Sequence, residues 1–153
     1  MKPEDLMIND IVYAVINNED DETGEYVEER HPAMITDLSP NTQLWADGHE
    51  CKYLLEYLDD CKDEGVDDIE PIPLTEEILE KNGFVYNEKF QCLYRLTRDG
   101  TWRIATDIDR TWLRIEQREF PFHECKMRAN YLHELQHALR LCGLTDLANS
   151  FKV

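Results

Sequence analysis

The chain is poor in basic side chains. Of its 153 residues, 16 are Lys or Arg and 33 are Asp or Glu, which gives a formal net charge of −17 at pH 7. A molecule this acidic repels a phosphate backbone at long range, so the composition makes nucleic acid an unfavourable partner. Hydrophobic residues still make up 42% of the chain and aromatic residues 10%. This is enough apolar surface to build a core, and it argues against wholesale disorder.

Long apolar runs are missing as well. No stretch approaches the roughly 20 apolar residues of a membrane-spanning helix, and residues 1–5 have no apolar stretch like that of a signal peptide. Paired cysteines are also lacking, because the five cysteines are scattered, odd in number and contain no C-x-x-C. They are Cys51, Cys61, Cys92, Cys125 and Cys142. We therefore expect a cytoplasmic protein with free thiols and no membrane partner.

Charge divides the chain into two parts. Residues 1–80 carry 24 acidic and 4 basic side chains, a balance of −20, whereas residues 81–153 carry 9 acidic and 12 basic side chains, a balance of +3. Two prolines in the segment 71–73 follow the acidic stretch 59–68, and prolines hold their neighbours extended. The sequence therefore predicts an acidic, β-rich module over residues 1–70 and an α+β module over residues 71–153.

Short strands separated by turn residues are expected in the first module. The β-branched run 11–16 predicts one strand, and weaker patterns predict strands at 33–36 and 43–46. Residues 53–58 fit a helix or a strand equally well. Residues 6–12 read Leu-x-x-x-Asp-x-Val, a pattern like the first strand of SH3-like modules, so a small β-barrel-like (SH3-like) module is expected.

The second module is expected to be a helix, a three-stranded antiparallel meander and a second helix. Thr75 is an N-cap for a helix over 75–82 that ends at Gly83. The remaining expected elements are strands at about 90–96, 102–106 and 111–116, a hairpin turn at 98–101, and a helix at about 130–142. One face of the first strand holds Phe90, Cys92, Tyr94 and Leu96. The buried stripe of the last helix is expected to be Leu132, Leu135, Ala138, Leu139 and Cys142. The predicted fold class is therefore α+β.

Two stretches carry a resemblance to a known family. They are DIEPIPLTEEILEKNGF at residues 68–84 and YLHELQHALRLCG at residues 131–143. Together they resemble the two recurring signatures of a family of small uncharacterised proteins from gut Bacteroidetes and from their phages and mobile elements. The resemblance covers roughly the second half of the chain. It implies no transferable activity, but it favours an accessory role that acts on a host or defence protein.

Residues 133–137 form an H-E-x-x-H sequence on the last predicted helix. In this spacing His133 and His137 lie one turn apart and can share a zinc ion, while Glu134 activates a water molecule. A catalytic zinc needs a third protein ligand, and the extended motif fails because Arg140 and Gly143 stand where Gly and His belong. Recruitment of His123 or Glu124 from upstream would be an unusual arrangement.

A structural interpretation of the same residues is simpler. The helix would bury its leucines and leave His133, His137 and Arg140 on the hydrated face. We favour this interpretation, with no catalytic residue, no metal and no cofactor, and keep a zinc-dependent hydrolase with zinc as its cofactor as the alternative. Cys142 is expected to be a core residue, and Cys125 has no recognisable catalytic partners.

Basic and aromatic residues alternate along the predicted meander. They are Arg95, Arg98, Arg103, Arg110, Arg114 and Arg118, with Tyr94, Trp102 and Trp112. This pattern resembles surfaces that bind single-stranded nucleic acid or nucleotides, which gives a further alternative function. The net charge opposes it, so we expect these arginines to pair with the acidic first module instead.

The sequence taken together predicts a non-enzymatic, acidic protein-interaction module. Its partner is expected to be another protein of unidentified kind. The opposite charge balances of the two modules also predict a homo-oligomer as an alternative assembly. An enzyme is disfavoured because no complete set of catalytic residues is present.

Overall fold

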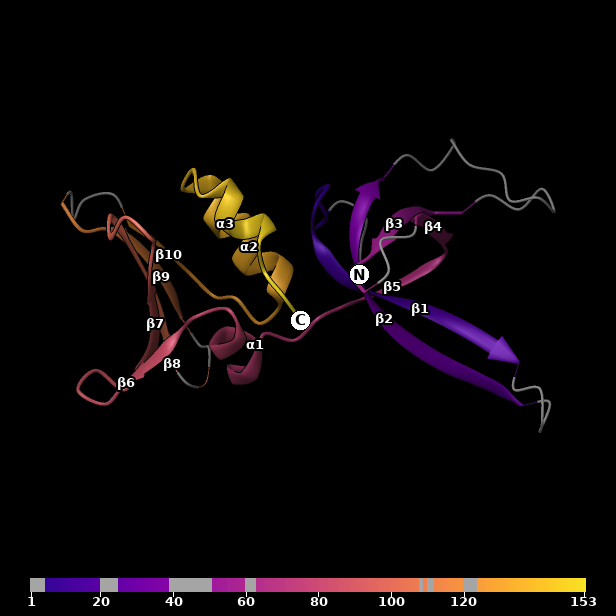
Figure 1. The fold of residues 1–153 in the computed structure, drawn as a ribbon, viewed down its shortest axis with the longest axis horizontal. Helices are drawn as coiled ribbons and strands as arrows, with labels where there is room; N and C mark the ends of the chain where they lie inside the picture. The colour runs from indigo at the N-terminus through magenta and orange to yellow at the C-terminus, as the bar shows by residue number, and fades with distance from the viewer. Residues whose placement is uncertain are drawn as a thin grey trace. The chain divides into compact units, whose positions relative to one another are not determined.

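The computed structural model describes residues 5–19, 25–38, 51–59, 63–107, 109, 112–119 and 124–153. It is an α+β structure made mostly of strands, with two five-stranded antiparallel sheets and C-terminal helices (Figure 1). The chain separates into two compact units, Met1–Ile72 and Pro73–Val153. No helix in the described ranges is long and apolar enough to span a membrane.

The N-terminal unit is a single antiparallel sheet with the strand order β4-β3-β2-β1-β5. Its strands are β1 (Ile11–Glu19), β2 (Tyr26–Asp37), β3 (Tyr53–Tyr57), β4 (Asp63–Val66) and β5 (Asp68–Pro71). Its core is a cluster of apolar side chains at alternating strand positions, which include Val12, Ala14, Ala33, Ile35 and Leu55. Alternation places these residues on one face, which is buried, while the residues between them, such as Tyr13 and Met34, are half-buried on the other face.

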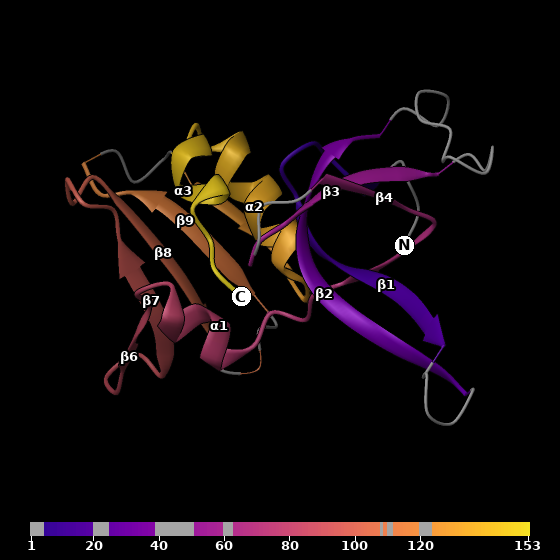
Figure 2. The ribbon, with the colours of Figure 1, turned by 45° about the vertical axis from the view of Figure 1, so that its right-hand side comes forward.

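Strands β1 and β2 extend beyond the rest of this sheet. They pair along their whole length from Ile11 opposite Met34 to Glu19 opposite Tyr26, whereas β5 pairs with β1 only as far as Val15. The outer part of the pair is thus a two-stranded ribbon, visible in Figures 1 and 2. Tyr26 is 74% exposed on this ribbon.

Several expectations for this unit need correction. The described strands do not close into a barrel, because β4 and β5 form the two edges of the sheet. The ambiguous segment 53–58 is strand β3, and its Tyr53, Leu55 and Tyr57 are buried on one face. Part of the acidic stretch 59–68 forms β4 and the start of β5. Val66 and Ile69 are buried in these strands, and the burial of their apolar side chains favours strand formation there. The strand expected at 43–46 lies outside the described residues.

The C-terminal unit begins with the helix predicted from Thr75. Helix α1 spans Glu76–Lys81, and the Thr75 hydroxyl accepts a hydrogen bond of 3.2 Å from the amide of Ile78. Gly83 has a φ of +79°, the left-handed conformation that ends a helix at low cost for glycine. The prediction for this helix is therefore confirmed, including its cap and its stop signal.

The second sheet is a meander with the strand order β10-β9-β8-β7-β6. Its strands are β6 (Val85–Asn87), β7 (Cys92–Leu96), β8 (Trp102–Asp107), β9 (Leu113–Gln117) and β10 (Glu124–Met127). The three predicted strands correspond to β7, β8 and β9. The expected three-stranded meander is incomplete, because the short edge strands β6 and β10 carry too few residues to show a periodic pattern.

Two helices complete the C-terminal unit. Helix α2 spans Leu132–Leu141 and α3 spans Thr145–Asn149. They lie over one face of the second sheet (Figure 2). Leu132, Leu135, Ala138 and Leu139 are fully buried, which confirms most of the predicted stripe. Cys142 was expected in the stripe but is only half-buried, because the helix ends at Leu141. Helix α3 was not predicted from the sequence.

The turn between β7 and β8 holds an exposed carboxylate in a network of hydroxyl donors. Asp99 accepts hydrogen bonds from the hydroxyls of Thr101, at 2.6 Å, and Thr97, at 2.5 Å. These bonds, with Thr101 the larger contributor, lower the pKa of Asp99 from 3.8 to about 2. A depressed pKa in the folded state means that the carboxylate stabilises the fold fully above pH 3.8, and that this contribution is lost as the pH falls through about 2.

We therefore expect the carboxyl carbon of Asp99 to titrate near pH 2 in an NMR pH series. The variant Thr101→Val removes the largest cause, so the pKa of Asp99 should rise toward 3.8. A wild-type midpoint near 3.8 would contradict the hydrogen-bond network described for this turn.

Candidate functional site

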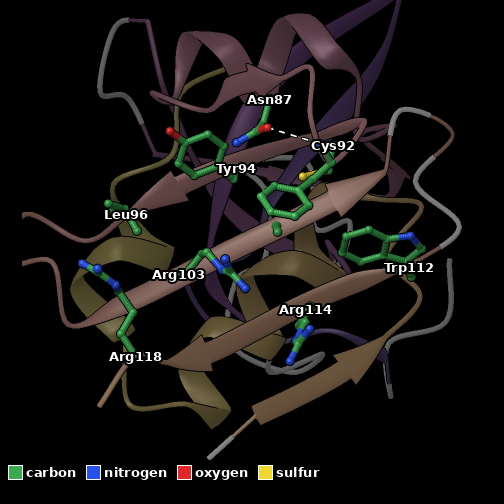
Figure 3. A pocket seen from close by; sticks show the side chains of 10 residues that line it. Asn87, Cys92, Tyr94, Leu96, Arg103, Trp112, Arg114 and Arg118 are labelled. Carbon is green, nitrogen blue, oxygen red and sulfur yellow. Dashed lines mark hydrogen bonds between the residues drawn. The ribbon is translucent and has the colours of Figure 1, made fainter. Parts of the chain in front are cut away.

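The face of the second sheet that α2 and α3 leave uncovered forms a concave surface. Alternation along β7, β8 and β9 turns Leu93, Ile104 and Ile115 toward the helices, where they are fully buried. Their strand neighbours line a hollow of about 490 Å³ on the open face (Figure 3). The residues of this hollow are Asn87, Phe90, Cys92, Tyr94, Leu96, Arg103, Ala105, Trp112, Arg114 and Arg118. Its volume lies in the range of ligand-binding clefts.

Aromatic side chains stand around the hollow and are open to solvent. Phe90 is 61% exposed and Trp112 is 39% exposed, while Tyr94 is half-buried on β7. The side-chain oxygen of Asn87 fixes the turn that carries Phe90, because it accepts a hydrogen bond of 3.2 Å from the amide of Phe90. The amide of Trp112 donates a hydrogen bond of 3.2 Å to Asp107. Local hydrogen bonds therefore hold both aromatic residues in place.

Two of the three arginines in the hollow are held by carboxylates of the same sheet. Arg114 forms ion pairs with Glu116 at 2.7 Å and with Glu124 at 2.8 Å. Arg103 also pairs with Glu116. Lys126 binds Glu124 at 3.0 Å, and it lowers the pKa of Glu124 below its usual range, with a smaller contribution from Arg114. These two arginines were expected to pair with the acidic first module, but both pair within their own sheet. Glu116 lies opposite Arg103 in the register of β8 and β9, and it follows Arg114 by two residues on the same face of β9.

Arg118 differs from the other two arginines. It follows β9, and its guanidinium donates a hydrogen bond of 3.3 Å to the carbonyl oxygen of Gly100. Among the described residues it has no carboxylate within ion-pair distance. Its positive charge is therefore available to a ligand carboxylate or phosphate, which a guanidinium binds well.

The hollow contains much of what the sequence pattern indicated. Phe90, Cys92, Tyr94 and Leu96 were expected to share one face, and all four line the hollow, which confirms that prediction. Burial raises the pKa of the Cys92 thiol, so this thiol is a poor nucleophile.

The interleaved basic and aromatic set is divided between the two faces. Arg103, Arg114, Arg118, Tyr94 and Trp112 lie in the hollow. Arg95 and Trp102 lie on strand positions that face the helices, and Arg110 lies outside the described residues. Arg95 donates a hydrogen bond of 2.6 Å to the carbonyl oxygen of Asn82, and burial lowers its pKa. The sequence pattern did not distinguish the two faces of the sheet, because alternate residues of β7 and β8 point to opposite faces. Asn87 was missed, although its place before a turn was a usable signal.

The H-E-x-x-H residues lie on α2, and their roles can be described individually. One carboxylate oxygen of Glu134, Oε2, accepts hydrogen bonds from the amides of Asn130, at 2.6 Å, and Tyr131, at 3.1 Å, at the start of the helix. This is a capping box, and it stabilises the first turn of α2. The observed role of this carboxylate is thus to stabilise the helix start.

The two histidines are adjacent but differently placed. The rings of His133 and His137 are 5.8 Å apart at an interplanar angle of 76°. His133 is 6% exposed and stacks on Tyr131 at 5.8 Å, which corrects the expectation that it lies on the hydrated face. No group of three or more His, Cys, Asp or Glu side chains among the described residues could hold a metal ion. Of the upstream donors considered, Glu124 is engaged by Arg114 and Lys126, and His123 lies outside the described residues.

No protein-family model, curated protein or solved structure matches this chain.

Proposed function

We propose that the protein is a non-enzymatic interaction protein whose C-terminal unit binds an extended segment of another protein in the hollow. One observation carries this proposal: exposed aromatic side chains and arginines surround a concave face of about 490 Å³. Phenylalanine, tyrosine, tryptophan and arginine are the residue types enriched where protein interfaces concentrate their binding energy. Lysine and carboxylates are depleted at such sites, and none of the described residues that line the hollow is of these types.

The shape of the hollow favours an elongated occupant. Trp112 and Arg118 stand before and after β9, which spans Leu113–Gln117. At about 3.3 Å per strand residue, their Cα atoms are about 20 Å apart. Figure 3 shows the two side chains at opposite ends of the face, with Arg103 between them. A segment in the hollow would therefore place an apolar side chain near Trp112 and a carboxylate near Arg118.

Charge favours a protein segment over a nucleic-acid strand. Glu116 and Glu124 neutralise much of the charge of Arg103 and Arg114, so Arg118 is the main free cation among the described residues that line the hollow. A strand of the same length carries several phosphates and would meet too few free cations, in addition to the net charge of −17. A protein segment needs only one acidic side chain.

The strand order supports a finer inference about the N-terminal unit. In the order β4-β3-β2-β1-β5, four consecutive strands form a meander and β5 returns to pair with β1. We propose that this is an SH3-like arrangement, in which the long β1–β2 pair bends between two parts of the sheet.

The resemblance of residues 68–84 and 131–143 to phage and mobile-element proteins supports an accessory role toward a host or defence protein.

Selection from a displayed random-peptide library on the immobilised full-length protein tests the binding proposal. We expect enriched peptides that pair an apolar or aromatic residue with an acidic one. Trp112→Ala should weaken the binding of a synthetic selected peptide by about tenfold or more, because truncation of an aromatic interface anchor commonly costs about 2 kcal/mol or more. Arg118→Ala should weaken only those peptides that contain the acidic residue.

The matched control is Tyr86→Ala, which removes a 40% exposed aromatic residue of β6 that does not line the hollow. This variant should bind the same peptides as the wild type. The proposal is wrong if no peptide is enriched, or if Trp112→Ala and Tyr86→Ala have equal effects. Tighter binding of a labelled single-stranded oligonucleotide, lost steeply with salt, would favour the nucleic-acid alternative instead.

A further inference from the structure

Two thiols of the C-terminal unit meet on the side of the sheet that the helices cover. Cys125 lies on β10 and pairs with Ile115 of β9. Directly opposed residues of antiparallel strands point to the same face, and Ile115 is fully buried on the helix side. Cys142 is the C-cap residue of α2, and its thiol is in hydrogen-bond contact with the thiol of Cys125. Strand and helix thus bring together residues that are distant in sequence.

The surroundings of this pair distinguish it from the other thiols. Among the cysteines that the structure describes, Cys125 and Cys142 are half-buried thiols, whereas Cys51 and Cys92 are buried. An oxidant in solution can therefore reach the pair more easily than the two buried thiols. Burial raises the pKa of Cys142, and the neighbouring Cys125 thiol raises it further. The rate of any reaction through the Cys142 thiolate should accordingly increase with pH.

We propose that Cys125 and Cys142 are a modification site at which a reversible disulfide forms, with a low-molecular-weight disulfide such as oxidised glutathione as the oxidant. One thiol loses its proton, and its thiolate attacks a sulfur of oxidised glutathione. The first glutathione leaves as a thiolate and a mixed disulfide remains. The second protein thiol then loses its proton and displaces the second glutathione. One protein disulfide forms, and one oxidised glutathione is reduced to two thiols.

The position of the Cys125–Cys142 disulfide would affect the stability of the C-terminal unit. It would tie β10, an edge strand, to the end of α2 and close a loop with the 16 residues 126–141 between the two cysteines. Such a closure restricts the unfolded chain, so the oxidised C-terminal unit should be more stable. For a unit of this size we expect its melting temperature to rise by on the order of 10 °C.

Peptide mapping of the full-length protein after incubation with a glutathione redox series tests the proposal. Free thiols are blocked with N-ethylmaleimide, and the protein is digested with trypsin. Cleavage after Arg118, Lys126 and Arg140 places the two cysteines in separate peptides, 119–126 and 141–152. We expect these peptides to be recovered as one linked species, an intact mass of the unblocked protein that is lower by two hydrogens, and the rise in melting temperature.

Variants separate this result from general oxidation. Cys125→Ser and Cys142→Ser should each abolish the linked species and the thermal shift, whereas Cys92→Ser should keep both. Stable mixed disulfides with glutathione at both positions, or equally abundant links to other cysteines, would overturn the proposal. So would full recovery of both thiols as maleimide adducts at the most oxidising ratio. None of these outcomes bears on peptide binding in the hollow, which lies on the other face of the sheet.

Discussion

Replacement of Leu135 by alanine should destabilise the C-terminal unit by about 2–5 kcal/mol. Leu135 lies on α2, is fully buried, and belongs to the stripe that packs against the second sheet. Truncation removes the transfer free energy of the buried carbons and leaves a cavity, because Leu132 and Leu139 on the same helix face cannot move to fill it. This is a large part of the stability of a unit of about 80 residues.

Urea denaturation followed by tryptophan fluorescence measures this effect. In a Trp45→Phe background the two remaining tryptophans, Trp102 and Trp112, both belong to the C-terminal unit and report its unfolding. Leu141→Ala is the matched control, since Leu141 is on the same helix but 80% exposed, and it should change the free energy of unfolding by less than about 0.5 kcal/mol. Equal losses in the two variants would contradict the assigned orientation of α2.

Asn82→Ala should cost on the order of 3 kcal/mol in the same unit. The buried side-chain amide of Asn82 donates hydrogen bonds of 2.7 Å to the carbonyl oxygens of Ile78 and Lys152, and its oxygen accepts one of 2.8 Å from the amide of Lys152. These bonds join the end of α1 to a segment 70 residues away. Alanine would leave partly buried backbone groups without these partners, and leaving such groups unsatisfied is more costly than the net value of the bonds.

The control for Asn82 uses the partner residue itself. Lys152→Ala removes an exposed side chain but keeps the backbone amide and carbonyl that Asn82 binds, so stability should be nearly unchanged. Hydrogen exchange provides a second measurement, because the amide of Lys152 should lose protection in Asn82→Ala and keep it in Lys152→Ala. Unchanged protection in Asn82→Ala would show that this bond does not secure the segment.

Both stability predictions bear on the proposed binding site. The hollow and the helices occupy opposite faces of one sheet, so the side chains in the hollow keep their positions only while the buried face holds β7, β8 and β9 together. Binding measurements on hollow variants therefore need a folded C-terminal unit as a reference. Trp112→Ala and Tyr86→Ala meet this need because both remove exposed side chains.

The sequence alone predicted the features that depend on residues close together in the chain. Thr75 and Gly83 mark the two ends of α1, because a cap and a left-handed residue act within one helical turn. The shared face of Phe90, Cys92, Tyr94 and Leu96 follows from the two-residue period of a strand. The α+β class and the main helix and strands were set by the same local rules.

Only the tertiary structure decided the features that join distant segments. The edge strands β6 and β10 exist because longer neighbours offer them hydrogen-bond partners, and His133 is buried because α2 packs on a sheet. The pairing of Arg103 with Glu116, and the meeting of Cys125 with Cys142, depend on strand register and helix placement. Periodicity in one segment carries no information on which other segment will lie beside it. The placement of segments beside one another determined both the hollow and the thiol pair.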